Sequence, residues 1–157
     1  MTPFVTVVSG TPRSGTSLMM QMLGAGGMEL LVDGLRRADR DNPRGYFELE
    51  AARALAADAS WLERAVGRAV KLVHALVPGL PSGQRYRIVL MRRDWSEVLA
   101  SQRVMLERRG GVPPGPDDER LAQLFAAQLR EVERWASDRC DVALLPVRAL
   151  AQLAFQL

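Results

Sequence analysis

The sequence predicts an α/β fold, in which a parallel sheet carries helices on both faces and so forms three layers. Short apolar runs alternate along the chain with longer segments of helical periodicity. The short runs are apolar at nearly every position, which is typical of strands buried on both faces. A length of 157 residues suits a single domain with a sizeable core, and 48% apolar and 25% charged residues are ordinary for a soluble globular protein.

The first half of the chain opens with a predicted strand over residues 4–8, where the side chains are apolar or β-branched. A glycine-bearing loop follows, then a helix over residues 18–23, which the glycines after it bring to an end. Residues 28–45 show no clear period and close on a turn. The remaining elements of this half are a helix over residues 49–66, a short strand over residues 69–73 and a Pro/Gly-rich loop over residues 78–83.

The second half begins with a strand over residues 86–91. Asp94 is a good N-cap for the next helix, and Glu97 stands three residues on, as in a capping box. This helix ends near Gly110, and a proline-rich loop follows it.

A further helix is predicted from Asp117 or Asp118 to about residue 137. Its apolar stripe consists of Leu121, Leu124, Phe125, Leu129, Val132 and Trp135. Residues 141–147 read as the last strand, and residues 148–157 are predicted to be helical.

The charge balance is modest, since 21 Lys and Arg against 18 Asp and Glu give a net charge of +3. Lys71 is the only lysine, and the arginines gather at residues 36–40 and 103–109. We interpret these arginines as parts of solvated helix faces, because a nucleic-acid surface needs a denser basic stripe with interleaved aromatic side chains. The sequence therefore predicts no nucleic-acid partner.

Cys140 is the only cysteine, which excludes an intrachain disulfide and fits a reducing compartment. The N-terminal apolar run is too short for a secretory signal and lacks a basic segment before it, and no run approaches the length that crosses a membrane. We therefore expect a cytoplasmic location and no membrane partner. The sequence leaves homo-oligomerisation open.

The loop between the first strand and the first helix has the order that builds an anion site. Loop and helix-start N–H groups converge there, and the helix dipole makes the point electropositive. Gly10 and Gly15 have the spacing of a Walker A loop, but Thr16 stands where that motif requires Lys. Arg13 is the loop's only cation, so the sequence indicates a P-loop-type sheet and argues against ATP or GTP hydrolysis.

Two motifs stand out: residues 12–17 read Pro-Arg-Ser-Gly-Thr-Ser, and Arg93 stands eight positions before Ser101. Together they resemble the 5′-phosphosulfate loop and the 3′-phosphate motif of the sulfotransferases that use 3′-phosphoadenosine 5′-phosphosulfate (PAPS). The Asn-Pro-Arg-Gly-Tyr-Phe-Glu segment at residues 42–48 looks like one in bacterial members. Val-Lys at residues 70–71, with Leu-Pro at 80–81, agrees with the same family.

The resemblance implies transfer of a sulfuryl group from PAPS to a hydroxyl or amine of a small-molecule or biopolymer acceptor, leaving 3′,5′-ADP and using no metal. Arg93 and Ser101 would bind the 3′-phosphate. The group that would bind the 5′ end, with Arg13 also steadying charge on the bridging oxygen, comprises Arg13, Ser14, Gly15, Thr16 and Ser17. Arg92, next to the 3′-phosphate arginine, is either a solvated neighbour or a second phosphate contact.

The general base has two candidates. Glu48 ranks slightly above His74, the only histidine, because His74 lies three residues after Lys71 whereas cytosolic family members place a histidine two residues after it. Glu48 can equally favour the first turn of the following helix, and His74 can be a partly buried strand-end residue. Lys71 is either structural or, by resemblance, a cation of the site.

The chain departs from the family near its end, because nothing after Leu150 matches the family's lid and basic glycine-containing loop. We therefore expect a single sulfotransferase-like domain over residues 1–157 that lacks the C-terminal part of the family fold. Two alternatives remain: a P-loop nucleotide kinase or NTPase, and a truncated nucleotide-binding remnant without catalysis. The missing Lys at Thr16, and arginines where an acidic Mg²⁺ ligand would follow the third strand, argue against the first alternative.

Overall fold

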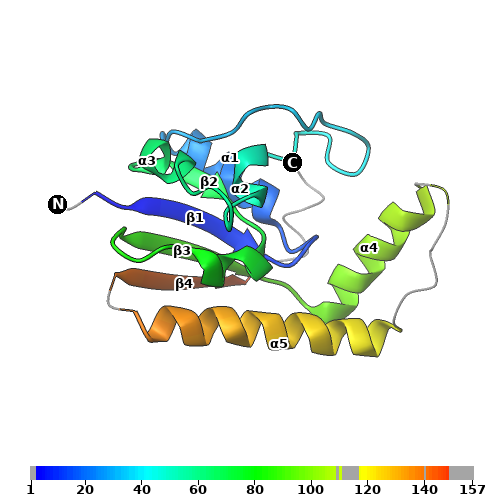
Figure 1. Cartoon of the computed structure of the whole chain (residues 1–157). Coiled ribbons are helices and arrows are strands. Elements are labelled where there is room, and N and C mark those ends of the chain that lie inside the picture. The colour runs from blue at the N-terminus through cyan, green and yellow to red at the C-terminus, as the bar shows by residue number, and fades with distance from the viewer. Residues whose placement is uncertain (1–2, 109, 111–116, 140, 149–157) are drawn as a thin grey trace.

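The computed structural model describes residues 3–108, 110, 117–139 and 141–148 (Figure 1). Its strands are β1 (Val5–Gly10), β2 (Ala69–Lys71), β3 (Tyr86–Arg92) and β4 (Val142–Arg148). They form one parallel sheet in the order β2-β1-β3-β4, with Val7 of β1 opposite Val70 of β2 and Ile88 of β3. The predicted α/β class and parallel sheet are therefore confirmed.

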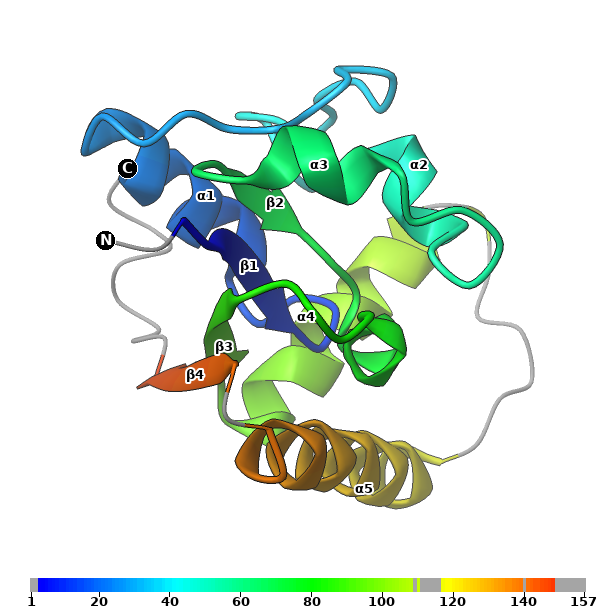
Figure 2. The same cartoon turned by 60° about the vertical axis from the view of Figure 1, so that its left-hand side comes forward.

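The helices are α1 (Thr16–Ala25), α2 (Glu50–Arg53), α3 (Trp61–Ala65), α4 (Trp95–Arg108) and α5 (Asp118–Ser137), with a 3₁₀ helix, η1 (His74–Gly79), after β2. Figure 2 looks more nearly along the strands and shows α1 on one side of β1 and α5 on the other. Within the described residues, no helix is long and apolar enough to cross a membrane.

Alternate residues of the central strands belong to two separate buried clusters, as the two-residue period of a strand requires. Val7 and Ile88 pack in a cluster with Trp61 of α3 and Leu129 of α5. Val8 packs in the other with Met20 of α1. All six residues of β1 are buried, as expected for a strand covered on both faces.

The single helix predicted over residues 49–66 is wrong, because two short helices, α2 and α3, occupy that stretch. Between them the Asp58 carboxylate accepts a hydrogen bond from the backbone N–H of Ser60 at 2.8 Å. Such a local side-chain bond competes with helical hydrogen bonding. The helical period appeared continuous because apolar residues in and beside both helices enter the same cluster, among them Leu49, Ala52, Leu55, Trp61, Leu62 and Ala65.

Three smaller differences concern element ends and faces. Pro78 and Gly79, predicted as loop, belong to η1. Leu124 of the predicted α5 stripe is 49% exposed, whereas Phe125, Leu129 and Val132 are buried as expected. Arg148, predicted to be helical, ends β4, and the rest of that predicted helix lies outside the described residues.

Candidate functional site

The loop after β1 turns tightly against β3. A Cβ atom at Gly10 would lie 2.4 Å from Ser14 Oγ and 2.8 Å from the carbonyl oxygen of Met91, so only glycine fits there. Gly15 has φ 99° and is the N-cap of α1. Arg13 has φ 66°, a left-handed conformation that is uncommon for a residue with a side chain and is often found at functional sites.

Arg13 links this loop to two distant segments. Its Nε donates to Ser101 Oγ at 2.8 Å, and one terminal nitrogen donates to the carbonyl oxygen of Asp41 at 3.1 Å. A terminal nitrogen of Arg93 donates in turn to the carbonyl oxygen of Arg13 at 3.2 Å. The structure thus brings together Arg13, Arg93 and Ser101, which the sequence assigned to the two ends of one ligand.

Arg93 is held by the helix that follows it. Its Nε donates to Glu97 Oε2 at 2.7 Å, an i,i+4 ion pair, and the Arg93 side chain is only 16% exposed. The predicted capping box is therefore half formed. Asp94 Oδ1 accepts from the N–H of Ser96 at 2.9 Å, as an N-cap does, while the Glu97 carboxylate is engaged by Arg93.

The hydroxyls of the loop differ in their surroundings. Ser14 is fully buried, and its Oγ donates to the carbonyl oxygen of Thr11 at 2.7 Å, so this hydroxyl stabilises the turn itself. Ser17 Oγ donates to the carbonyl oxygen of Tyr46 at 3.3 Å. Thr16 begins α1, and within the described residues no hydrogen bond to its side chain is found.

A long loop over residues 33–48 (light blue to cyan in Figure 1), here called the strap, contacts Arg13 and Ser17. Its two ends meet where the N–H of Asp33 donates to the carbonyl oxygen of Glu48 at 3.2 Å. Asp41 receives Arg13 through its carbonyl, and Asn42 Nδ2 donates to Ser17 Oγ at 2.9 Å. The strap therefore contacts both the cation and a hydroxyl of the loop.

Lys71, the last residue of β2, lies under the strap. Its ammonium donates to Ser17 Oγ at 3.3 Å and to the carbonyl oxygen of Tyr46. The Lys71 side chain is 13% exposed. Burial lowers its pKa, and the Glu48 carboxylate 3.5 Å away acts in the opposite direction.

Glu48 is the centre of a cluster of cations. One carboxylate oxygen lies 2.8 Å from Arg36 and 3.5 Å from Lys71, and the other lies 2.8 Å from Arg53. The Arg36 guanidinium stacks 3.5 Å from the centre of the Tyr46 ring. The Glu48 side chain remains 20% exposed.

His74 is packed below the loop, at the start of η1, and is 3% exposed. Its Nδ1 lies 3.1 Å from the carbonyl oxygen of Gly10 and its Nε2 lies 2.6 Å from Gln128 Oε1. The ring also contacts Phe125 edge to face. Both ring nitrogens thus have partners inside the protein.

Arg92 points to α5, where it pairs with Glu133.

Sequence reasoning named the segment around Asn42 and Tyr46 by resemblance but gave neither residue a role. Asp41 and Glu97 received no site role either. Asp41 is a partner of both Arg13 and, through its carboxylate at 3.1 Å, Arg108 of α4. Only Glu97 carried a local signal, because its i,i+4 spacing from Arg93 is readable without a structure.

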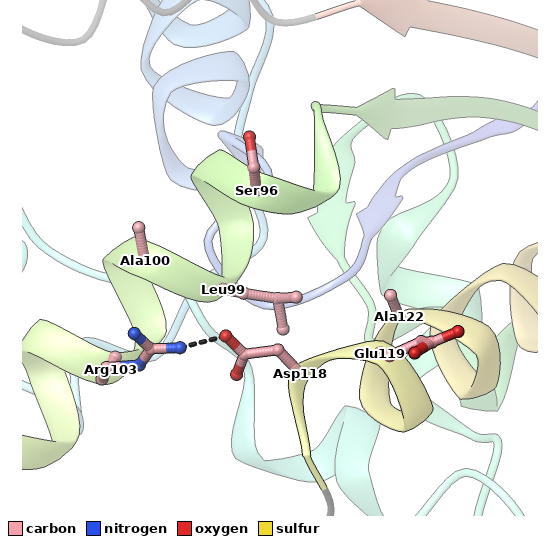
Figure 3. A pocket seen from close by; sticks show the side chains of 7 residues that line it. All are labelled: Ser96, Leu99, Ala100, Arg103, Asp118, Glu119 and Ala122. Atoms are coloured by element: carbon pink, nitrogen blue, oxygen red, sulfur yellow. Dashed lines mark hydrogen bonds and ion pairs between the residues drawn. The ribbon is translucent and has the colours of Figure 1, made fainter.

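A separate cavity of about 370 Å³ lies between α4 and the start of α5 (Figure 3). Leu99 and Ala122 provide apolar walls, and Arg103 pairs with Asp118 across it. None of the side chains predicted for the site lines this cavity.

No protein-family model and no curated protein matches the chain. Within the part of the chain that the structure describes, no three His, Cys, Asp or Glu side chains group in a way that could hold a metal ion. The groups that gather around the loop are two guanidiniums, an ammonium, hydroxyls and the start of α1, and these suit an anionic ligand.

Proposed function

We propose that the chain transfers a sulfuryl group from PAPS to a hydroxyl or amine acceptor. The observation that carries the proposal is the contact of Arg13 with Ser101 and Arg93, which joins the loop to the Arg93–Ser101 motif. PAPS is anionic at both ends, so it needs two phosphate sites on one surface. The loop after a first parallel strand, the order β2-β1-β3-β4 and two-sided packing of the sheet support a three-layer P-loop-type arrangement as part of the same proposal.

In the proposed complex, the N–H groups at the start of α1 and the Thr16 side chain hold the 5′ end. The Ser17 hydroxyl joins them by exchanging its bond to the carbonyl oxygen of Tyr46 for one to the ligand. The Ser14 hydroxyl is already bonded within the turn, so its contribution is to keep the loop in shape. Arg93 and Ser101 hold the 3′-phosphate. Binding requires Arg13 to exchange the carbonyl oxygen of Asp41 for an oxygen of the ligand.

During transfer, the bond from sulfur to the bridging phosphate oxygen breaks as a bond to the acceptor oxygen or nitrogen forms. Arg13 neutralises charge on the departing phosphate, and the acceptor proton passes to the base. We assign Glu48 as that base, because its side chain remains 20% exposed whereas His74 is 3% exposed. Both carboxylate oxygens of Glu48 are paired with cations, so accepting the proton requires one of these ion pairs to open. The Lys71 ammonium lies between Glu48 and Ser17 and steadies the transferred group.

Thermal denaturation with 3′,5′-ADP, AMP, ATP and ATP with Mg²⁺ tests the proposal. We expect 3′,5′-ADP without metal to raise Tm more than AMP does, because only 3′,5′-ADP carries the 3′-phosphate. A shift with ATP and Mg²⁺ alone would overturn the proposal and favour a nucleotide kinase or NTPase. If 3′,5′-ADP stabilises the protein but no acceptor in a broad screen leads to consumption of PAPS, nucleotide binding is supported and sulfuryl transfer is refuted.

A further inference from the structure

The acidic side chains of the strap all have hydrogen-bond or ion-pair partners within the protein. Asp33 accepts hydrogen bonds from the N–H groups of Leu35 at 3.0 Å and Glu50 at 2.6 Å. Asp39 accepts from the hydroxyl of Tyr46 at 2.7 Å and from backbone N–H groups of the turn. Asp41 and Glu48 pair with arginines. The acids of the strap are thus engaged by groups of the protein itself.

Three arginines of the strap show the opposite behaviour. Arg37, Arg40 and Arg44 are exposed. Among the described residues, no carboxylate lies within ion-pair distance of any of them. Each therefore presents a charged guanidinium that no described carboxylate neutralises. These arginines lie on a loop, which departs from the helix faces that the sequence suggested for residues 36–40.

The three arginines lie on one turn of the strap. Asp39 and Asn42 form an antiparallel bridge, with N–H to carbonyl distances of 3.4 Å and 3.2 Å in the two directions. The chain therefore reverses between them, with Arg40 at the tip and Arg37 and Arg44 on the two arms. The same turn contacts the anion loop, through the carbonyl of Asp41 and the side chain of Asn42.

We propose that Arg37, Arg40 and Arg44 bind an acidic polysaccharide, which is the acceptor of the proposed sulfuryl transfer. The acceptor role rests on the proposed function. Guanidinium groups recognise carboxylates and sulfates through paired hydrogen bonds. An acidic polysaccharide carries such groups at regular intervals beside the hydroxyls that the transfer requires.

The composition of the strap favours this ligand over a nucleic acid. Nucleic-acid surfaces pair basic side chains with exposed aromatic rings that stack on bases. Tyr46 is only 6% exposed, and the Arg36 guanidinium already covers its ring. The turn thus offers charge without a stacking platform.

The test compares two triple variants that remove the same charge. R37A/R40A/R44A removes the arginines of the strap, and R120A/R130A/R134A removes three exposed arginines of α5. Binding of size-defined heparin, neutral dextran and poly(U) is measured by titration at two salt concentrations. Binding of 3′,5′-ADP is measured in parallel on each variant.

We expect the strap variant to bind heparin at least about tenfold more weakly than the wild type and to show a shallower salt dependence. The α5 variant should lose less than about threefold. Equal losses in both variants, no heparin binding by the wild type, or tighter binding of poly(U) would overturn the proposal. If heparin binding depends on the strap but the protein does not bind 3′,5′-ADP, the strap is a polysaccharide-binding surface and its acceptor role is refuted. If the protein binds 3′,5′-ADP but heparin binding does not depend on the strap, only the polysaccharide-binding surface is refuted.

Discussion

Arg13 and Ser101 are 88 positions apart in the chain, yet Arg13 Nε donates to Ser101 Oγ at 2.8 Å. This contact exists because β1 and β3 are parallel neighbours, so the loop after β1 and the helix after β3 meet at the same edge of the sheet. Because Arg93 is bonded to the Arg13 carbonyl, a phosphate bound at either motif would lie close to groups of the other.

Arg93→Ala is expected to weaken 3′,5′-ADP binding about ten- to a hundredfold, because it removes a charge-assisted contact worth roughly 1.5–3 kcal/mol. AMP binding should change less than about threefold, since AMP has no 3′-phosphate. Isothermal titration calorimetry of both ligands measures the difference. Arg92→Ala is the matched control, because Arg92 pairs with Glu133 and should leave both affinities close to wild type. Equal losses of the two ligands in Arg93→Ala would refute the 3′-phosphate role.

Arg13→Ala is expected to lower turnover of PAPS about 10²-fold while changing the Kd of 3′,5′-ADP less than about fivefold, because its charge matters most as the phosphate departs. Ser101→Ala, which removes the partner of Arg13 Nε, should change the Kd more than kcat. Steady-state release of 3′,5′-ADP with an acceptor from the screen provides kcat. Unchanged turnover in Arg13→Ala would exclude a transition-state role.

Glu48→Gln and His74→Asn separate the two candidates for the general base. Glu48→Gln should lower turnover at least about 10²-fold, because it removes the proton acceptor. His74→Asn should retain turnover within about threefold but lower Tm, because the buried ring bridges Gly10 and Gln128. Turnover and Tm are measured on both variants. Loss of turnover in His74→Asn at an unchanged Tm would reverse the assignment.

The elements that the sequence predicted well are those whose capping residues and apolar periodicity lie within the element itself. α5 begins at the predicted acids, with the Asp117 side chain accepting from the N–H of Arg120 at 2.8 Å, and its apolar stripe is long. The strap could not be predicted in this way, because its contacts with Arg13 and Ser17 join segments 28 and 25 positions apart. Such contacts depend on chain topology, which hydrophobic periodicity does not encode.

Gly10→Ala is expected to destabilise the chain by about 1–3 kcal/mol, because the added Cβ would overlap Ser14 Oγ and the Met91 carbonyl. It should also weaken 3′,5′-ADP binding, since Ser14 belongs to the anion loop. Gly79→Ala is the control, because its Cβ would meet only Leu55 at an ordinary 3.7 Å. Urea denaturation measures both free energies of unfolding. Equal stabilities of the two variants would show that the loop does not pack against β3 as described.

The stability of the chain between neutral and alkaline pH should depend on Lys71. Burial lowers the pKa of Lys71 from its ordinary 10.5, so the folded state binds this proton less tightly than the unfolded chain does. Protonated Lys71 therefore costs stability below its folded pKa, and the cost disappears as pH rises to 10.5. Tyr46 and Tyr86 have the opposite effect, because burial raises both pKa values, that of Tyr86 to about 12. The stability that they contribute is therefore present below the ordinary 10.0 and is lost as pH rises from there through the raised pKa values.

Comparison with Lys71→Met isolates the lysine, because both proteins keep the tyrosines and Lys71 is the only lysine. The free energy of unfolding of the wild type, relative to the variant, should increase from about pH 7 to about pH 10. Urea denaturation at intervals across that range measures it. Glu48→Gln should increase the loss in free energy of unfolding that the protonated Lys71 causes at neutral pH, because the Glu48 carboxylate opposes the effect of burial on the Lys71 pKa. If the difference in free energy of unfolding between the wild type and Lys71→Met does not change with pH, the Lys71 ammonium is solvated. That result would contradict its placement between Glu48 and Ser17.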